Sequence, residues 1–143
     1  MNTLANELKE KAKKLHKTII LPETEDERVL RATEKIIKEG IAKIALVGDE
    51  KNLKEKASEI GISLEGAIFY NPESCATIDE MAELLRKKRE KKGMTFETAK
   101  ATLMSDARYF AAMLVHQGRV DGMVAGSSSP TAHVLRAAIH IIG

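Results

Sequence analysis

Residues 18–48 read TIILPETEDERVLRATEKIIKEGIAKIALVG, and this stretch decides the fold. Its two ends, Thr18–Leu21 and Lys43–Gly48, are short β-branched and aliphatic runs typical of buried strands. Apolar residues between them recur at helical spacing, and Thr24 with Glu27 three residues later has the spacing of a capping box. A strand, a helix and a second strand in this order predict a parallel sheet.

The same alternation continues to the end of the chain. Two more strands are expected, at Ala67–Tyr70 and Gly122–Ala125. Further helices are expected over residues 4–15, 50–60, 79–92, 96–104, 109–117 and 131–142. The pattern predicts one α/β domain over residues 1–143, with a parallel sheet of about four strands and helices on both faces. Because the apolar helix 131–142 is followed directly by Gly143, we expect this domain to be the first part of a larger fold.

The charge distribution disfavours a nucleic-acid partner. The chain has 23 Lys and Arg against 21 Asp and Glu, a formal net charge of +2. The run 86–92 (RKKREKK) contributes +5 of this, so the rest of the chain carries 2 − 5 = −3. No aromatic residue interrupts the run to stack on a base. The run is interpreted either as a solvated helix end or as a clamp for a polyanionic ligand such as a coenzyme phosphate.

Membrane insertion and export are also disfavoured. No uncharged stretch reaches the roughly 18 apolar residues of a membrane span. The first residues carry charges every few positions, unlike the apolar core of a signal peptide. Cys75 is the only cysteine, so no disulfide can form within the chain. We therefore expect a cytoplasmic protein with no membrane partner.

The best candidate site is the turn after the fourth strand, which reads GSSSPT at residues 126–131. Ligands of open α/β sheets bind beyond the carboxyl ends of the strands, and a helix N-terminus offers N–H groups to an anion. The predicted contacts of a phosphate or carboxylate are Ser127, Ser128, Ser129, Thr131 and Arg136. Arg136 would point back toward the start of its helix and bind a phosphate with two hydrogen bonds. In the alternative interpretation Ser129 only caps the helix, with Pro130 at its first position, and Arg136 is an ion-pair partner.

Metal binding is not predicted. Ser129, His133, Arg136 and His140 form one polar stripe on the last helix, at offsets of 0, 4, 7 and 11 residues. The two histidines are separated by about 10 Å of helix rise, too far to share one metal ion. The acidic stretch 23–27 fits helix capping better than metal ligation. The chain also lacks the G-x-S-x-G, P-loop and G-x-G-x-x-G motifs.

Five segments in order nevertheless resemble one known family. They are ILPE at 20–23, DERVL at 26–30, the run from Arg89 to Thr95 containing KGMT, DGMVAG at 121–126, and TAHVLR at 131–136. Together they resemble the phosphate acetyltransferase (phosphotransacetylase) family, part of the phosphate acetyl/butyryltransferase superfamily, over nearly the whole chain. One departure is S-P-T-A-H at 129–133, where many members have H-T-T-A-D.

The resemblance implies acetyl transfer between acetyl phosphate and coenzyme A, giving acetyl-CoA and phosphate. Coenzyme A is then a substrate, and no bound cofactor is expected. Arg89 and Arg136 fall on family arginines that contact coenzyme A or phosphate. The implied fold has two domains, is similar to isocitrate and isopropylmalate dehydrogenases, and forms a homodimer at full length; this chain is its first, incomplete domain. The remaining catalytic groups are expected downstream of residue 143, so the isolated chain is expected to be inactive. The alternatives are a phosphate butyryltransferase and a non-catalytic regulatory module that binds coenzyme A or an acyl phosphate.

Overall fold

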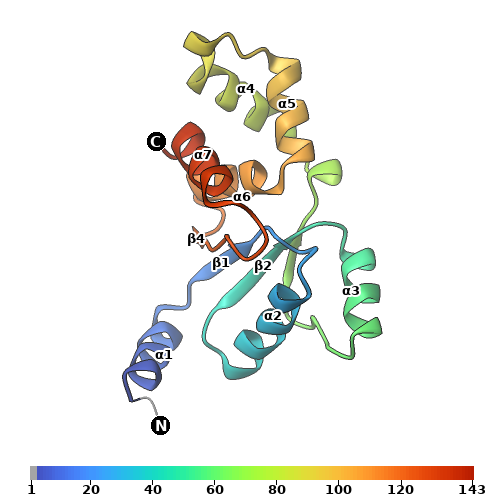
Figure 1. The fold of residues 1–143 in the computed structure, drawn as a ribbon, viewed down its shortest axis with the longest axis vertical. Coiled ribbons are helices and arrows are strands. Elements are labelled where there is room, and N and C mark those ends of the chain that lie inside the picture. Colours follow the sequence, from blue (N-terminus) through green and yellow to red (C-terminus); the bar gives the residue numbers. More distant parts are fainter. Residues whose placement is uncertain (1–2) are drawn as a thin grey trace.

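A computed structural model describes residues 3–143 and contains a four-stranded parallel sheet in the order β3-β2-β1-β4 (Figure 1). The elements are α1 (Thr3–Leu15), β1 (Thr18–Leu21), α2 (Glu27–Glu39), β2 (Lys43–Val47), α3 (Glu50–Glu59), β3 (Ile68–Tyr70), η1 (Pro72–Ser74), α4 (Ile78–Lys88), η2 (Glu90–Lys92), α5 (Phe96–Ser105), α6 (Ala107–His116), β4 (Gly122–Met123) and α7 (Thr131–Ile141). The predicted α/β class and the four parallel strands are confirmed.

Helices cover both faces of the sheet, as predicted. Alternate strand residues point to opposite faces, so β1 and β2 contribute to two separate cores. On one face Ile20 packs with side chains of α4, α5, α6 and α7, including the fully buried Phe110. On the other face Leu21 and Leu46 pack with α2 and α3 around Leu30. Figure 1 shows these two helical layers on either side of the strands.

The fourth strand is shorter than the predicted Gly122–Ala125. It pairs only with β1, where Ile19 lies opposite Gly122 and Ile20 opposite Met123. It is an edge strand of the described sheet, and the side chain of Val124 is largely exposed. A strand with one neighbour has fewer ladder hydrogen bonds to extend it, which explains the early end.

The predicted cap of α2 is wrong. Asp26, and not Thr24, is the N-cap, since its Oδ1 accepts a hydrogen bond from the backbone N–H of Arg28 at 2.9 Å. The chain first makes a turn in which the N–H of Asp26 donates to the carbonyl of Glu23. Thr24 Oγ1 instead donates to the carbonyl of Val47 at 2.8 Å, which ties this turn to the end of β2. The predicted capping role of the acidic stretch is therefore carried by Asp26 alone.

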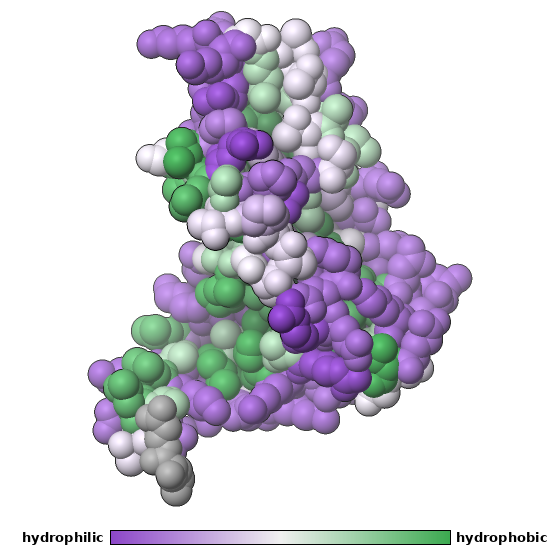
Figure 2. Space-filling model, in the orientation of Figure 1, coloured by the Kyte–Doolittle hydropathy of each residue, from purple (hydrophilic) through white to green (hydrophobic). Residues whose placement is uncertain are grey.

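The first helix is weakly attached to the rest of the fold. None of its described residues is buried, and Leu4, Leu8 and Leu15 are each more than half exposed. One ion pair, from Lys9 to Glu39 at 3.2 Å, joins α1 to α2. Figure 2 shows apolar surface over α1 and near the end of α7. Among the described helices, none is long and apolar enough to cross a membrane.

Candidate functional site

The loop after β4 is organised by a carboxylate from the other end of the sequence. Glu23 follows β1 and is 4% exposed. Its Oε1 accepts hydrogen bonds from the backbone N–H groups of Gly126 (2.6 Å) and Ser127 (3.1 Å), and its Oε2 accepts one from Ser128 (3.0 Å). The two serine hydroxyls add contacts of 3.3 and 3.2 Å. Gly126 has φ +120°, which favours glycine and lets consecutive N–H groups turn toward one acceptor.

These hydrogen bonds keep Glu23 ionised. Burial by itself raises the pKa of the carboxyl, but the donors of the loop outweigh burial and lower the pKa to about 2. The loop that was predicted to bind the anion of a ligand thus already binds the carboxylate of Glu23. Ser127 and Ser128 remain predicted substrate contacts, and an anion reaches their N–H groups only by displacing Glu23.

The predicted start of the last helix is wrong in detail. The N-cap position of α7 is Pro130 and not Ser129, and no side chain caps this end. Ser129 Oγ instead accepts a hydrogen bond from Arg108 Nη1 at 2.6 Å. Arg108 is itself fixed by Asp106, whose Oδ1 accepts from Arg108 Nε at 2.9 Å. The strong guanidinium donor draws the hydroxyl away from the helix N–H groups, while Thr131 is exposed at the first turn.

The polar stripe of α7 is divided between different partners. Ser129 contacts Arg108. His140, two turns beyond the exposed His133, packs on α6, where its Nδ1 lies 2.7 Å from the hydroxyl of Tyr109. The two rings meet edge to face, with centroids 5.8 Å apart. Tyr109 is 7% exposed, so this contact is part of the packing between α6 and α7.

Arg89 and Arg136 act electrostatically on the Tyr109–His140 contact. Burial and then the charge of Asp106 raise the pKa of Tyr109, and the positive charges of Arg136, Arg89 and Arg108 offset part of this rise. Burial lowers the pKa of His140, and Arg89 and Arg136 lower it further. Two arginines that stand far apart in the sequence thus act on the same pair of side chains.

The basic run 86–92 spans the end of α4 and the following η2. Arg86 is an ion-pair residue of the helix surface, bonded to Glu83 at 2.6 Å and lying 3.7 Å from Glu90. The lysines of the run are exposed. Arg89 differs from the lysines because it is partly buried, and its charge lowers the pKa of His140 on α7. The run is thus a helix end whose lysines are exposed and whose two arginines are partly buried.

Sequence reasoning missed Glu23 and Arg108 as site residues. Glu23 was assigned to helix capping, and its true partners lie more than 100 residues away in sequence. No sequence motif marks Arg108, because its contact with Ser129 arises only when α6 and α7 pack together. The signal that was present for Glu23 is its position directly after a buried strand, where polar groups of open α/β sheets gather.

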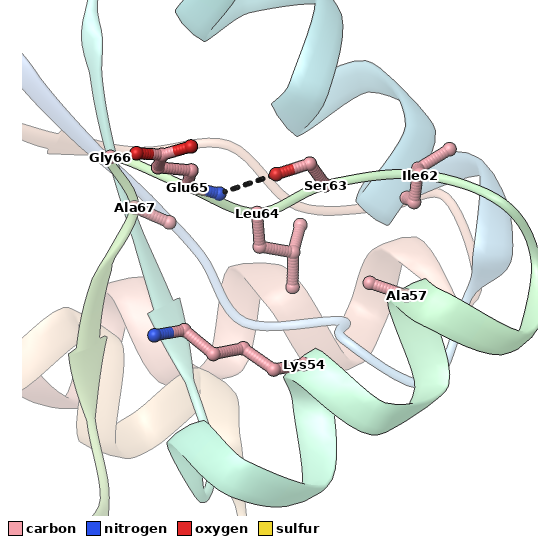
Figure 3. A pocket seen from close by; sticks show the side chains of 8 residues that line it. All are labelled: Lys54, Ala57, Ile62, Ser63, Leu64, Glu65, Gly66 and Ala67. Atoms are coloured by element: carbon pink, nitrogen blue, oxygen red, sulfur yellow. Dashed lines mark hydrogen bonds between the residues drawn. The ribbon is translucent and has the colours of Figure 1, made fainter.

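A separate cavity of about 480 Å³ lies between α3 and the segment that follows it (Figure 3). Ala57 and Leu64 line this cavity and belong to the core on the α2–α3 face, opposite α6 and α7. Its lysine, Lys54, is bonded to Glu50 at 2.6 Å and lies over the ring of Phe69. The cavity therefore offers no free cation to an anionic ligand. Within residues 3–143 no three His, Cys, Asp or Glu side chains are placed to hold a metal ion.

The structure shows an α/β domain whose candidate site residues lie on the loop after β4, on α7 and at the end of α4, and comparison with known proteins gives the family. The sequence model of the phosphate acetyl/butaryl transferase family matches residues 3–143. The chain therefore belongs to this family.

Curated relatives and solved structures agree with this assignment. The chain is 42% identical over 133 residues to the phosphate acetyltransferase of Acetivibrio thermocellus and 43% identical over 131 residues to that of Clostridium acetobutylicum. These alignments cover 93% and 92% of this chain but 39% of each relative. The crystal structure of a phosphotransacetylase from Streptococcus pyogenes superposes with a TM-score of 0.88 at 32% identity, covering 99% of this chain and 43% of that one. The chain thus spans about two-fifths of the length of the relatives it matches.

Proposed function

We propose that this chain supplies substrate-binding residues of an enzyme that transfers an acetyl group between acetyl phosphate and coenzyme A. Membership of the phosphate acetyl/butaryl transferase family supports the reaction class. The proposal reaches particular residues because Arg89 and Arg136 stand in the segments that resemble the family, and because both act electrostatically on Tyr109 and His140. Guanidiniums suit a phosphate ligand, since each presents paired N–H donors to phosphate oxygens.

The proposed reaction needs orientation and charge stabilisation from these residues. The coenzyme A thiolate attacks the acetyl carbonyl carbon, a C–S bond forms, and the bond from that carbon to the phosphate oxygen breaks. The phosphate leaves with the electron pair of that bond. Arg89 and Arg136 hold the phosphate and stabilise its charge, and Ser129 and Thr131 at the start of α7 add polar contacts. Ser127 and Ser128 join them if the ligand displaces Glu23.

We propose that the isolated chain binds substrate but turns it over little or not at all. The support is that the chain covers about two-fifths of the length of its relatives. In this proposal the remaining catalytic groups lie farther along the full-length protein. Coenzyme A is a substrate in this proposal, and no bound cofactor takes part. The full-length protein is proposed to act as a cytoplasmic homodimer.

The test combines a binding and a turnover measurement on the 143-residue chain. Acetyl phosphate binding is measured by calorimetry for the wild type, Arg89→Ala and Arg136→Ala. The matched control is Arg31→Ala, an exposed arginine paired with Glu27 on α2. We expect weaker binding in the first two variants and unchanged binding in the control. Equal binding by Arg136→Ala and the wild type would contradict the proposed site.

Turnover is followed as acetyl-CoA formation from acetyl phosphate. We expect none above the uncatalysed rate. Turnover that Arg136→Ala abolishes would show that a complete site is present and would overturn the proposed inactivity.

The family description favours one second candidate, transfer of a butyryl group. It differs only in the acyl chain, so the phosphate contacts stay the same. The dissociation constants of acetyl phosphate and butyryl phosphate, each measured by calorimetry on the wild-type chain, separate the two.

A further inference from the structure

The start of α7 is supported from the neighbouring helix. Pro130 occupies the N-cap position of α7, and no side chain caps this end. Ser129, one residue earlier, is tied to α6, because its Oγ accepts a hydrogen bond from Arg108 Nη1 at 2.6 Å. The two helices lie side by side (Figure 1). A side chain of α6 therefore takes the place that a helix cap would have at the start of α7.

Arg108 is itself held in one orientation. Asp106 is the N-cap of α6, and its Oδ1 accepts hydrogen bonds from the backbone N–H of Arg108 at 3.0 Å and from the side-chain Nε at 2.9 Å. Both side chains are partly buried. Because the guanidinium is planar and rigid, a bond at Nε also restricts the direction of Nη1. The position of the Ser129 hydroxyl is thus set by the cap of α6.

Ser129 also faces the carboxylate that organises the loop. Burial raises the pKa of Glu23, and the hydroxyl of Ser129 is one of the hydrogen-bond donors that lower it. Ser129 therefore stands between a cation from α6 and an anion that follows β1. These contacts hold the end of the loop from both sides, immediately before α7 begins.

We propose that Arg108 is a positioning residue of the proposed site, which acts through Ser129 to fix the start of α7. This inference rests on the proposed function, because only there do Thr131 and Arg136 contact acetyl phosphate. Thr131 stands two residues after Ser129, and Arg136 about two turns after it, so a shift at the start of the helix moves both. Arg108 needs no contact with the ligand. It holds the helix in place before binding and so lowers the cost of ordering the site.

The test is a double-mutant cycle on acetyl phosphate affinity, measured by calorimetry on the 143-residue chain. The variants are Arg108→Gln, Ser129→Ala and their combination, with Ser129→Thr as the conservative replacement that keeps the hydroxyl. The matched control is Arg119→Gln. Arg119 is exposed, and its Nη1 donates to the hydroxyl of Thr77 at 3.0 Å, so this pair has the same chemistry but does not involve α7.

Each single change, Arg108→Gln or Ser129→Ala, should weaken binding about 5-fold, the size of one hydrogen bond. If Arg108 acts through Ser129, the combination is also weakened about 5-fold, whereas independent effects would multiply to about 25-fold. Ser129→Thr and Arg119→Gln should bind like the wild type. A merely structural role of Arg108 would not make its effect depend on the hydroxyl of Ser129.

Multiplying losses in the combined variant would overturn this inference. Unchanged affinity in Ser129→Ala, with binding still lost in Arg136→Ala, would also overturn it and leave the proposed function intact. The absence of any Arg136-dependent binding would overturn the proposed function and this inference with it. If Arg108→Gln fails to fold, NMR of the Arg108 guanidinium decides. Separate Nη1 and Nη2 signals are expected in the wild type and should merge in Ser129→Ala, and separate signals in both would contradict the proposed link.

Discussion

Replacing Glu23 by Gln should destabilise the fold strongly, because one carboxylate accepts the hydrogen bonds of a whole loop. Gln has a single acceptor oxygen, so its amide NH2 would face either the N–H of Ser128 or those of Gly126 and Ser127. At least one backbone donor of the loop would lose its acceptor. The substitution preserves side-chain size, so packing changes little.

The expected magnitude follows from the pKa of Glu23, which the loop lowers from 4.5 to about 2. Each pKa unit corresponds to about 1.4 kcal/mol, so the ionised carboxylate contributes about 3 kcal/mol to the free energy of unfolding. The residue is 4% exposed, but its donors lie on an exposed loop that water screens, so about 3 kcal/mol is an upper value. A loss of about 3 kcal/mol is a large part of the stability of a domain of this size.

The same value gives a pH dependence with a definite sign. A carboxylate whose folded-state pKa is lowered stabilises the fold above its unfolded pKa, 4.5, and this stabilisation is lost as pH falls toward 2. Wild-type stability should therefore fall across this window by up to about 3 kcal/mol from Glu23 alone. In Glu23→Gln that contribution should be missing.

Urea unfolding followed by circular dichroism at pH 7 and between pH 5 and 2 measures both effects. The matched control is Glu25→Gln, an exposed neighbour that accepts one hydrogen bond, from the hydroxyl of Ser128 at 2.6 Å. It should change stability by no more than about 0.5 kcal/mol. Equal unfolding midpoints for Glu23→Gln and the wild type at pH 7 would refute the assigned role of Glu23.

Three further substitutions test the fold by the same unfolding measurement. Leu30→Ala, in the core between α2 and the sheet, should cost about 2–5 kcal/mol, while Leu135→Ala, 54% exposed on α7, should leave the unfolding midpoint nearly unchanged; equal losses would contradict the assigned core. Asp26→Ala should lower the free energy of unfolding by about 1 kcal/mol, because the N-cap of α2 is lost. An unchanged unfolding midpoint would show that Asp26 does not stabilise this helix end. Gly126→Ala should cost about 1–3 kcal/mol, since φ is +120° there although a Cβ would meet no atom; a neutral effect would show that the loop relaxes freely.

The fold could be predicted from the sequence because its signals are local. The aliphatic runs that begin at Thr18 and Lys43 became adjacent parallel strands, and the apolar spacing between them became α2. The order of the strands in the sheet depends on how the helices pack on its two faces. The spacing of apolar residues along the sequence carries no information about this packing. The length of β4 was overestimated for a related reason, since Val124 has strand-like chemistry but the described sheet gives it a neighbour on one side only.

The site was predicted less well because its hydrogen bonds join distant segments. Thr24 and Ser129 each had the residue type and position of a helix cap, yet both hydroxyls bond to groups from other elements. A hydroxyl that caps a helix gains one hydrogen bond from a helix N–H. A hydrogen bond to a buried carbonyl or from a guanidinium in another element contributes about as much stability. Which partner is nearer is a property of the folded chain.

The internal ligand of the loop also changes where an anion is expected to bind. If Glu23 held only part of the loop, a phosphate could still use the remaining N–H groups beside Ser128. The carboxylate instead engages three consecutive N–H groups and two hydroxyls, and its charge would repel a second anion at the same place. In the proposed function, recognition of a phosphate then falls to side-chain cations such as Arg89 and Arg136, which both act electrostatically on Tyr109 and His140. Binding through guanidiniums weakens with added salt when the groups are exposed, so Arg136, exposed on α7, should make the site sensitive to ionic strength.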